Sequence, residues 1–200
     1  MRNFTVNSEQ LRAASRSLGD VVADPALWPT MLEQFSAAAG ASGAALLRSD
    51  NRTPDNPRTA SMQENVKNYF ATGWHTRDTL SKRMFPLFMR GRKVVSEQDI
   101  VTAEEMRRLD FYNEVLIPFG FLWAAGIGFW AGPTLWAAII LRSPRQGPFE
   151  QHEKAMLAQL APRLSETATL SSAVGGDALS AATNALHLVG QPALALRRRF

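Results

Sequence analysis

The side chains that could do chemistry in this sequence are aromatic rings that carry a polar atom, together with one aspartate. Tyr69, Trp74 and Asp78 lie close together along the chain, and Tyr112 follows in a later segment rich in apolar residues. The polar atom of each tyrosine or tryptophan needs a partner when the ring is buried. Apolar rings with a few polar contacts are the usual lining of a small-molecule pocket. The pattern is consistent with a binding cavity, although most such rings serve only as core.

A second candidate set lies in residues 121–130, which have the length and composition of a strand. Alternate residues of a strand face opposite ways, so Phe121 and Trp123 share one face while Ala124, Gly126 and Gly128 share the other. A face of such small residues lets another group approach the backbone. That group is either a packed helix, which is the commoner case, or a small ligand. The full set expected to line a ligand site is Tyr69, Trp74, Asp78, Tyr112, Phe121, Trp123, Gly126 and Gly128.

Patterns for catalysis and for metal or cofactor binding are missing from the sequence. It has no cysteine, and its three histidines, His75, His152 and His187, do not have the spacing of zinc ligands. No Gly-x-Ser-x-Gly nucleophile motif occurs. Gly126 and Gly128 lack the third glycine and the following helix of a dinucleotide-binding turn. We therefore expect neither an enzyme nor a bound metal or cofactor.

Charge and composition indicate a globular protein without a broad nucleic-acid-binding face. The formal net charge is +4, and Arg197, Arg198 and Arg199 supply three of those charges, so the rest of the chain is close to neutral. The lack of cysteine and of an apolar N-terminal leader favours a cytoplasmic location.

The longest apolar run, residues 115–141, contains no charged residue and is long enough to cross a membrane, which takes about 20 apolar residues. Two breaks argue against a span: Pro118-Phe119-Gly120 near its start and Gly132-Pro133 in its middle. The Gly-Pro pair is a turn signal, and the pieces on either side of it have strand length. We predict a central antiparallel β-hairpin rather than a membrane helix.

Around this hairpin, the periodicity of apolar residues predicts further elements. Helices are expected over residues 8–18, 28–39, 63–74, 102–116 and 149–174, and strands over 42–48, 59–62 and 93–100. Thr102 and Glu105 have the spacing of a capping box that starts the fourth of these helices. Residues 84–89 are apolar but contain Pro86, and the pattern assigns no element to them.

The helix predicted over residues 149–174 carries a stripe of leucines, Leu157, Leu160 and Leu164, with a bend expected at Pro162. A two-fold partner is one way to bury such a stripe, and symmetric dimers are the commonest oligomers. A predicted helix over residues 178–188 offers another way, by folding back onto the stripe. We predict a homodimer formed through the stripe, with the folded-back helix as the alternative.

The order of these elements, together with two sequence phrases, resembles the N-terminal GAF-like sensor domain of bacterial LuxR-type helix-turn-helix transcriptional regulators. The first phrase runs from Glu105 to Gly120 (EMRRLDFYNEVLIPFG), and the second is the turn Gly147-Pro148-Phe149-Glu150. The resemblance extends over residues 28–196. It implies an α/β (α+β) fold of GAF/PAS-like type, in which helices cover the faces of a mostly antiparallel sheet. It also implies that residues 1–174 are the sensor domain and that residues 175–200 are a linking helix and the start of a following domain.

The resemblance implies a function as well: a cytoplasmic domain that binds a small molecule and relays the signal to a DNA-binding domain outside this chain. In the quorum-sensing members, an aromatic-x3-Trp-x3-Tyr pattern lines the pocket for acyl-homoserine lactones. Phe70 and Trp74 match that pattern, but Asp78 stands in place of the tyrosine and the later Asp-Pro is absent. These differences argue against that class of ligand. The alternative function is a dimerisation or interaction module that binds no ligand.

Overall fold

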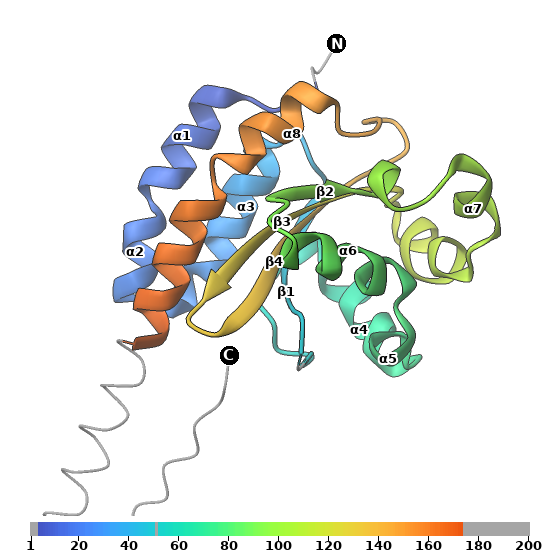
Figure 1. Cartoon of the computed structure of the whole chain (residues 1–200), viewed down its shortest axis with the longest axis horizontal. Coiled ribbons are helices and arrows are strands. Elements are labelled where there is room, and N and C mark those ends of the chain that lie inside the picture. Colours follow the sequence, from blue (N-terminus) through green and yellow to red (C-terminus); the bar gives the residue numbers. More distant parts are fainter. Residues whose placement is uncertain (1–3, 51, 174–200) are drawn as a thin grey trace, which may run out of the picture.

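The structure is a computed structural model that describes residues 4–50 and 52–173. The described residues form a four-stranded antiparallel sheet with helices on both of its faces (Figure 1). The strands are β1 (Gly43–Arg48), β2 (Val94–Ser96), β3 (Trp123–Ala131) and β4 (Thr134–Arg142), in the order β1-β4-β3-β2. The predicted α+β fold class is confirmed, while the narrower GAF-like assignment stays a prediction.

β3 and β4 form the predicted central hairpin. They pair from Trp123 opposite Arg142 to Ala131 opposite Thr134. The turn between them contains Gly132 with a φ of +57°, a conformation that side chains other than glycine rarely adopt. Residues 115–141 thus contain this hairpin, and no helix among the described residues is long and apolar enough to cross a membrane.

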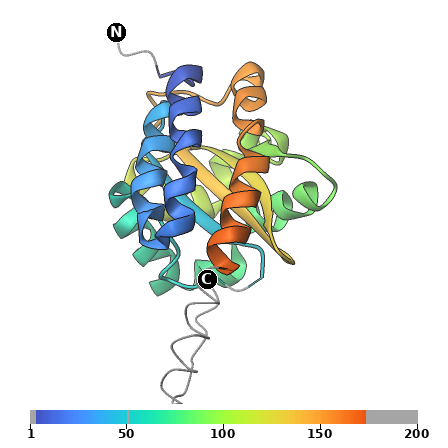
Figure 2. The ribbon, with the colours of Figure 1, turned by 90° about the vertical axis from the view of Figure 1, so that its left-hand side faces the viewer.

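The first helical layer joins the two ends of the described chain on one face of the sheet (Figure 2). It consists of α1 (Ser8–Arg16), α2 (Leu18–Ala23), the short turn η1 (Pro25–Leu27), α3 (Trp28–Ala38), α8 (Gln151–Ala158) and a helix over residues 161–173. Ala125, Ile127 and Phe129 of β3 belong to the core of this layer, as the alternation along a strand requires. Within β3 their position confirms the predicted alternation, but Phe121, which was predicted to share a face with Trp123, precedes β3 and belongs to a different core cluster.

The second helical layer covers the opposite face of the sheet. It contains η2 (Ala60–Met62), α4 (Gln63–Ala71), α5 (Trp74–Arg77), α6 (Thr79–Met89), η3 (Glu97–Asp99), α7 (Ala103–Arg108), the π-helical η4 (Tyr112–Leu116) and η5 (Ile117–Phe119). The small residues Ala124 and Gly126 of β3 contact this layer. The two faces of β3 therefore pack into two different hydrophobic cores, one on each side of the sheet.

The strand predicted over residues 59–62 is wrong. Thr59 donates its backbone N–H to Ala44 O at 2.8 Å, and its side-chain Oγ1 accepts the N–H of Ala44 at 3.0 Å. The chain then turns at once into η2, so the pairing with β1 extends no further. In a longer strand pairing the N–H of Ala44 would donate to a backbone carbonyl, and here it donates to the hydroxyl of Thr59 instead.

Four predicted helices are interrupted: two break close to their expected ends, after Arg16 and after Ala71, and two break well inside their expected ranges. α7 begins with the predicted Thr102–Glu105 capping box but ends at Arg108, because Leu109 is extended with a ψ of 120° before the chain continues into η4. The helix predicted over residues 149–174 is broken by a turn at residues 159–160, just before Pro162, whose ring nitrogen cannot donate to the preceding turn. Residues 84–89, which the sequence left unassigned, are the second half of α6.

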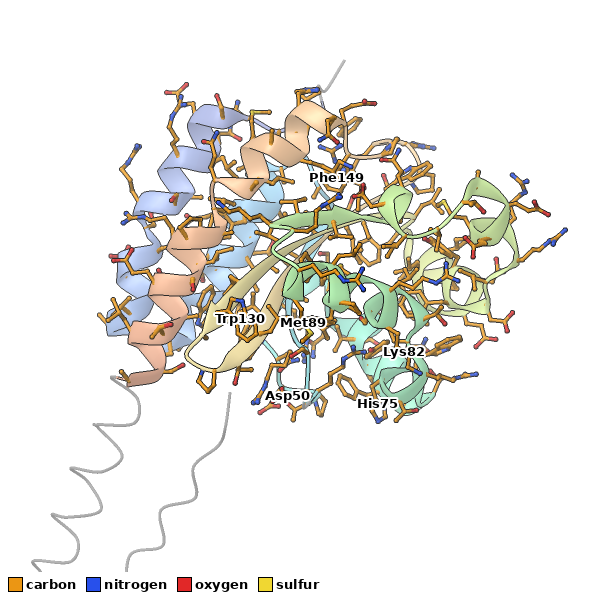
Figure 3. All side chains as sticks on the ribbon, viewed as in Figure 1. Asp50, His75, Lys82, Met89, Trp130 and Phe149 are labelled. Carbon is orange, nitrogen blue, oxygen red and sulfur yellow. The ribbon has the colours of Figure 1, made fainter. Side chains whose placement is uncertain are left out.

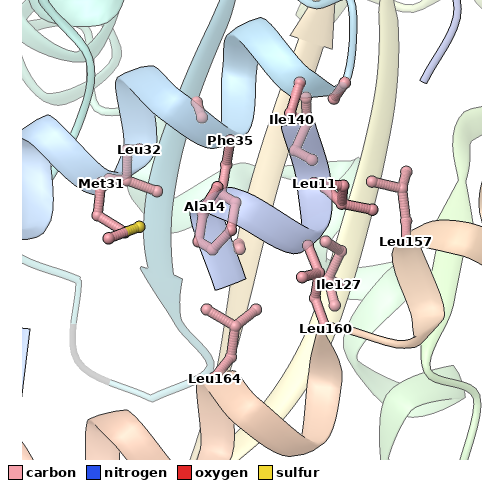
Figure 4. Close-up of a cluster of buried hydrophobic side chains, with 14 of the residues drawn as sticks. Leu11, Ala14, Met31, Leu32, Phe35, Ile127, Ile140, Leu157, Leu160 and Leu164 are labelled. Carbon is pink, nitrogen blue, oxygen red and sulfur yellow. The ribbon is translucent and has the colours of Figure 1, made fainter. Parts of the chain in front are cut away.

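The predicted dimer seam is also wrong. Leu157, Leu160 and Leu164 are 0%, 3% and 0% exposed, and they pack inside the chain in one core cluster with side chains of α1, α3 and the sheet (Figure 4). Large apolar side chains that do remain exposed include Met89 on α6 and Trp130 on the hairpin (Figure 3), as well as Leu170 on the helix over residues 161–173. A homodimer stays a prediction, but the leucine stripe no longer supports it. The predicted segment 175–200 lies outside the described residues.

Candidate functional site

A cavity of about 110 Å³ lies between the sheet and the second helical layer. Most of the side chains around it are apolar, and they come from all four strands and, in the helical layer, chiefly from α4, α6 and η4. Typical pockets for drug-sized ligands measure about 300–1,000 Å³, so this space suits a smaller molecule. The apolar part of the lining includes Ala45, Leu47, Met62, Val66, Phe70, Leu80, Met84, Val95, Ile100, Phe111, Val115, Leu116, Ala124, Gly126, Ile139 and Leu141.

The cavity lies where the small residues of β3 face the second helical layer, because helix α6 packs against only part of that face. A Cβ on Gly126 would lie 2.6 Å from the Met84 sulfur, and one on Gly128 would lie 2.5 Å from the Phe88 ring. Helix α6 therefore contacts the sheet directly at Gly128. The open space begins at Gly126 and continues beside Ala124, so the small-residue face is shared between a packed helix and a cavity.

One polar cluster at the cavity is centred on Asp78, the residue that caps α6. Asp78 Oδ1 accepts the backbone N–H of Ser81 at 3.0 Å, and Oδ2 accepts the Ser81 hydroxyl at 2.6 Å and the Tyr69 hydroxyl at 3.0 Å. Arg52 Nη1 lies 3.2 Å from the same Oδ2 and donates to the Tyr69 oxygen at 2.5 Å. Burial, followed by the negative charge of Asp78, raises the pKa of Tyr69, so its hydroxyl remains protonated. The cluster is therefore an internally satisfied ion pair.

Replacing Tyr69 by phenylalanine should lower the free energy of unfolding by about 1–2 kcal/mol, because the change leaves Arg52 and Asp78 each short of one buried partner. Urea denaturation monitored by tryptophan fluorescence measures the loss. Tyr112→Phe is the matched control, since the Tyr112 hydroxyl is buried and has no hydrogen-bond partner among the described residues. That variant should be neutral or slightly more stable. Equal losses in both variants would contradict the role assigned to the Tyr69 hydroxyl.

A second polar group at the cavity is Glu97, which is 1% exposed. Its Oε2 accepts the N–H of Ala124 at 2.6 Å, because β2 ends at Ser96 and offers that N–H no backbone partner. Its Oε1 has no hydrogen-bond partner among the described residues. Burial raises the pKa of Glu97 to about 7, although the backbone N–H groups of Ala124 and of Glu97 itself and the Lys154 charge oppose the rise.

The structure brings three of the eight predicted site residues to the cavity, namely Tyr69, Asp78 and Gly126. Trp74 is buried near them, where its Nε1 donates to Glu114 Oε2 at 3.0 Å and its ring meets the Phe111 ring edge-on. The other four lie away from the lining. Tyr112 and Phe121 are buried in the same helical layer, Trp123 is half-buried at the start of β3, and Gly128 lies under Phe88.

Several polar residues of the site were not predicted from the sequence, and Arg52, Ser81 and Glu97 are the ones on which its polar contacts depend. Ser81 could have been found, because Asp78 and Ser81 have the spacing of a helix cap and its N3 residue. Arg52 lies in a polar loop that gives no sign of reaching Asp78. Glu97 is near the capping pattern Ser96–Asp99, which explains that turn but not the inward direction of its side chain. Among residues 4–50 and 52–173, no group of three or more histidines or acidic residues could hold a metal ion.

Comparison with known proteins gives a likeness of fold. No protein-family model matches the sequence, and no curated protein matches it by sequence. Among solved structures, the chain is similar to the LBD domain of VqsR from Pseudomonas aeruginosa, with a TM-score of 0.58 over 80% of this chain and 94% of that chain. The two sequences are 15% identical, so the likeness concerns the fold alone. It agrees with the α+β architecture described above.

Proposed function

We propose that this chain contains the ligand-binding sensor domain of a LuxR-type transcriptional regulator, which holds a small and largely apolar molecule in the cavity. The observation that carries the proposal is the apolar cavity with two buried acidic residues, Asp78 and Glu97, in its lining. Similarity in fold to a domain described as an LBD supports the same role. The proposal includes a cytoplasmic homodimer and a DNA-binding domain outside this chain, and it involves no catalytic step.

A route from the cavity to the opposite helical layer supports a signalling role. Lys154 of α8 lies 3.2 Å from both carboxylate oxygens of Asp99 and 3.3 Å from Ser96 Oγ. Ser96 and Asp99 flank Glu97, and Ser96 also lines the cavity. A ligand that moves this turn would therefore move the start of α8. Binding shifts a conformational equilibrium only when the ligand contacts its two states differently, and this turn is where we expect that difference.

A dimerisation module without a ligand is the second candidate function. Phe88 and Met84 of α6 already fill the space over Gly128 and part of that over Gly126. This packing favours a domain whose core is complete by itself. The two candidates differ in one property, since only the sensor should gain stability from a small molecule.

Filling the cavity separates the two functions. In Ala124→Leu, the larger side chain should occupy the space where the ligand is proposed to bind. A small apolar compound found by thermal-shift screening should stabilise the wild-type protein, by about 2.7 kcal/mol at one hundred times its Kd. The same compound should not shift the melting temperature of the variant.

The matched control is Ala71→Leu, which makes the same chemical change at an exposed position of α4, a helix that itself lines the cavity. This control should bind the compound like the wild type. A screen in which no compound stabilises the wild type, or in which every compound acts equally on the Ala124 variant, would favour the module without a ligand.

A further inference from the structure

One acidic residue at the cavity is left without the partners that a buried carboxylate needs. Glu97 Oε1 is buried and accepts no hydrogen bond from the described residues, while Oε2 is occupied by the Ala124 N–H. The nearby cation Lys154 is bound to Asp99 and Ser96 instead. Buried polar atoms are almost always hydrogen-bonded, so an unsatisfied oxygen in a cavity lining needs an explanation.

Asp78, the other acidic residue of the lining, shows what a satisfied site looks like. Its two oxygens accept from Ser81 and Tyr69, and Arg52 supplies the opposite charge at 3.2 Å. The protein thus completes the Asp78 cluster from its own side chains. At Glu97, Oε1 has no donor among the described residues, and the nearby cation Lys154 makes its hydrogen bonds with Asp99 and Ser96 rather than with this oxygen, which belongs to a residue that lines the cavity.

We propose that Glu97 anchors a basic nitrogen, so that the ligand is a small amine whose ammonium group donates to Glu97 Oε1. The apolar part of the amine would fill the space beside Ala124 and Gly126. This inference rests on the proposed sensor function and names its ligand class. An ammonium group supplies the donor and the counter-charge together, and charge-assisted hydrogen bonds are the strong ones in proteins. The cavity of about 110 Å³ limits the amine to a compact one.

The groups around Glu97 give the proposal a pH dependence. The charges of Lys154 on α8 and Asp99 on η3 both act on the Glu97 carboxylate. The Glu97 charge in turn acts on the Tyr112 hydroxyl of η4 and, after burial, helps to raise the pKa of Tyr112. With a pKa of about 7, Glu97 is mostly ionised at pH 8 and mostly protonated at pH 6. An alkyl ammonium stays charged at both values. Because the ammonium pairs with the ionised form, its affinity should fall about tenfold from pH 8 to pH 6.

Titration calorimetry with matched probes tests the proposal. The pair 2-phenylethylamine and 2-phenylethanol differs only in an ammonium or a hydroxyl group, and a series of shorter and longer pairs covers other sizes. The wild type should bind the amine at least about tenfold more tightly than the alcohol at pH 8. Glu97→Gln keeps an oxygen for the Ala124 N–H and should therefore fold, which its melting temperature checks. That variant should bind both members of a pair alike, with no change between pH 6 and pH 8.

Glu104→Gln is the control, because Glu104 is an exposed acid of α7 that forms an ion pair with Arg108 and does not line the cavity. This substitution should leave both affinities and their pH dependence unchanged. If the alcohols bind the wild type as tightly as the amines, or if Glu97→Gln keeps the preference for amines, the amine proposal is overturned while the sensor function stands. If no pair binds the wild type and Ala124→Leu changes nothing, the sensor function itself fails.

Discussion

Replacing Glu153 by glutamine should destabilise the protein by about 3–5 kcal/mol, the largest loss that we expect from a single substitution. The side chains of Glu153 and Arg142 are each 1% exposed. They form two hydrogen bonds, Nη1 to Oε2 at 3.1 Å and Nη2 to Oε1 at 2.8 Å. Glutamine would leave the guanidinium buried without its counter-charge, and a buried unpaired charge is among the costliest defects in a fold.

This ion pair joins segments that are far apart in the sequence. Glu153 also accepts the N–H of Val6 at 2.9 Å, and Arg142 donates to Ala39 O at 2.7 Å and to Pro148 O at 3.1 Å. The N-terminal segment, the end of α3, the end of β4 and the start of α8 thus meet at one point. Burial alone would raise the pKa of Glu153, but its hydrogen bonds outweigh that effect and hold the pKa below its usual value. The stabilisation is therefore present above the usual carboxylate pKa and is lost as the pH falls through the lower, folded-state value.

Urea denaturation at pH 7 measures the loss, and two variants control for its cause. Glu104→Gln removes an exposed acid from an i,i+4 pair with Arg108 and should change stability by no more than about 0.5 kcal/mol. The double variant Arg142→Met with Glu153→Leu removes both charges and should recover much of the loss, because no unpaired charge remains. A double variant as unstable as Glu153→Gln would show that the other hydrogen bonds of the pair matter more than its charges.

The parts of the fold that followed from the sequence depend on local patterns. The Gly132-Pro133 turn and the alternation along β3 predicted both the hairpin and the faces of its residues, because period and turn chemistry act over a few neighbours. The capping box at Thr102 and Glu105 was also predicted for this reason. Predictions were wrong where a contact between distant residues determines the local structure. At Thr59, for example, a side-chain hydroxyl accepts the N–H of Ala44 and the pairing with β1 ends there.

The candidate site followed from the sequence only in part, because its polar partners are distant along the chain. Aromatic spacing indicated Tyr69 and Asp78, and both line the cavity. Arg52 completes their cluster from a loop that precedes α4, and Glu97 reaches the N–H of Ala124 across the end of β2. Neither contact produces a periodic pattern of residues from which it could be predicted. The wrong prediction of a dimer through the leucine stripe has the same cause. The spacing of the leucines indicates that they are buried, but it does not indicate which part of the protein covers them.

Replacing Leu164 by alanine should lower the free energy of unfolding by about 2–5 kcal/mol without changing the oligomeric state. Leu164 is 0% exposed and lies in the core between the helix over residues 161–173, the sheet and the N-terminal helices (Figure 4). Truncation there removes buried apolar contacts and leaves a cavity that the surrounding helices can only partly close. Urea denaturation measures the loss, and light scattering of the folded protein gives its mass.

Leu170→Ala is the matched control, since Leu170 is on the same helix and is 46% exposed. Its effect on stability should stay within about 0.5 kcal/mol. If Leu164→Ala instead leaves the unfolding curve unchanged and halves the mass in solution, the leucine contacts a second copy and its burial within the chain is wrong. If the wild type is a dimer and Leu164→Ala remains one while losing stability, the subunits meet through another surface, and the exposed Met89 and Trp130 become the first positions to test.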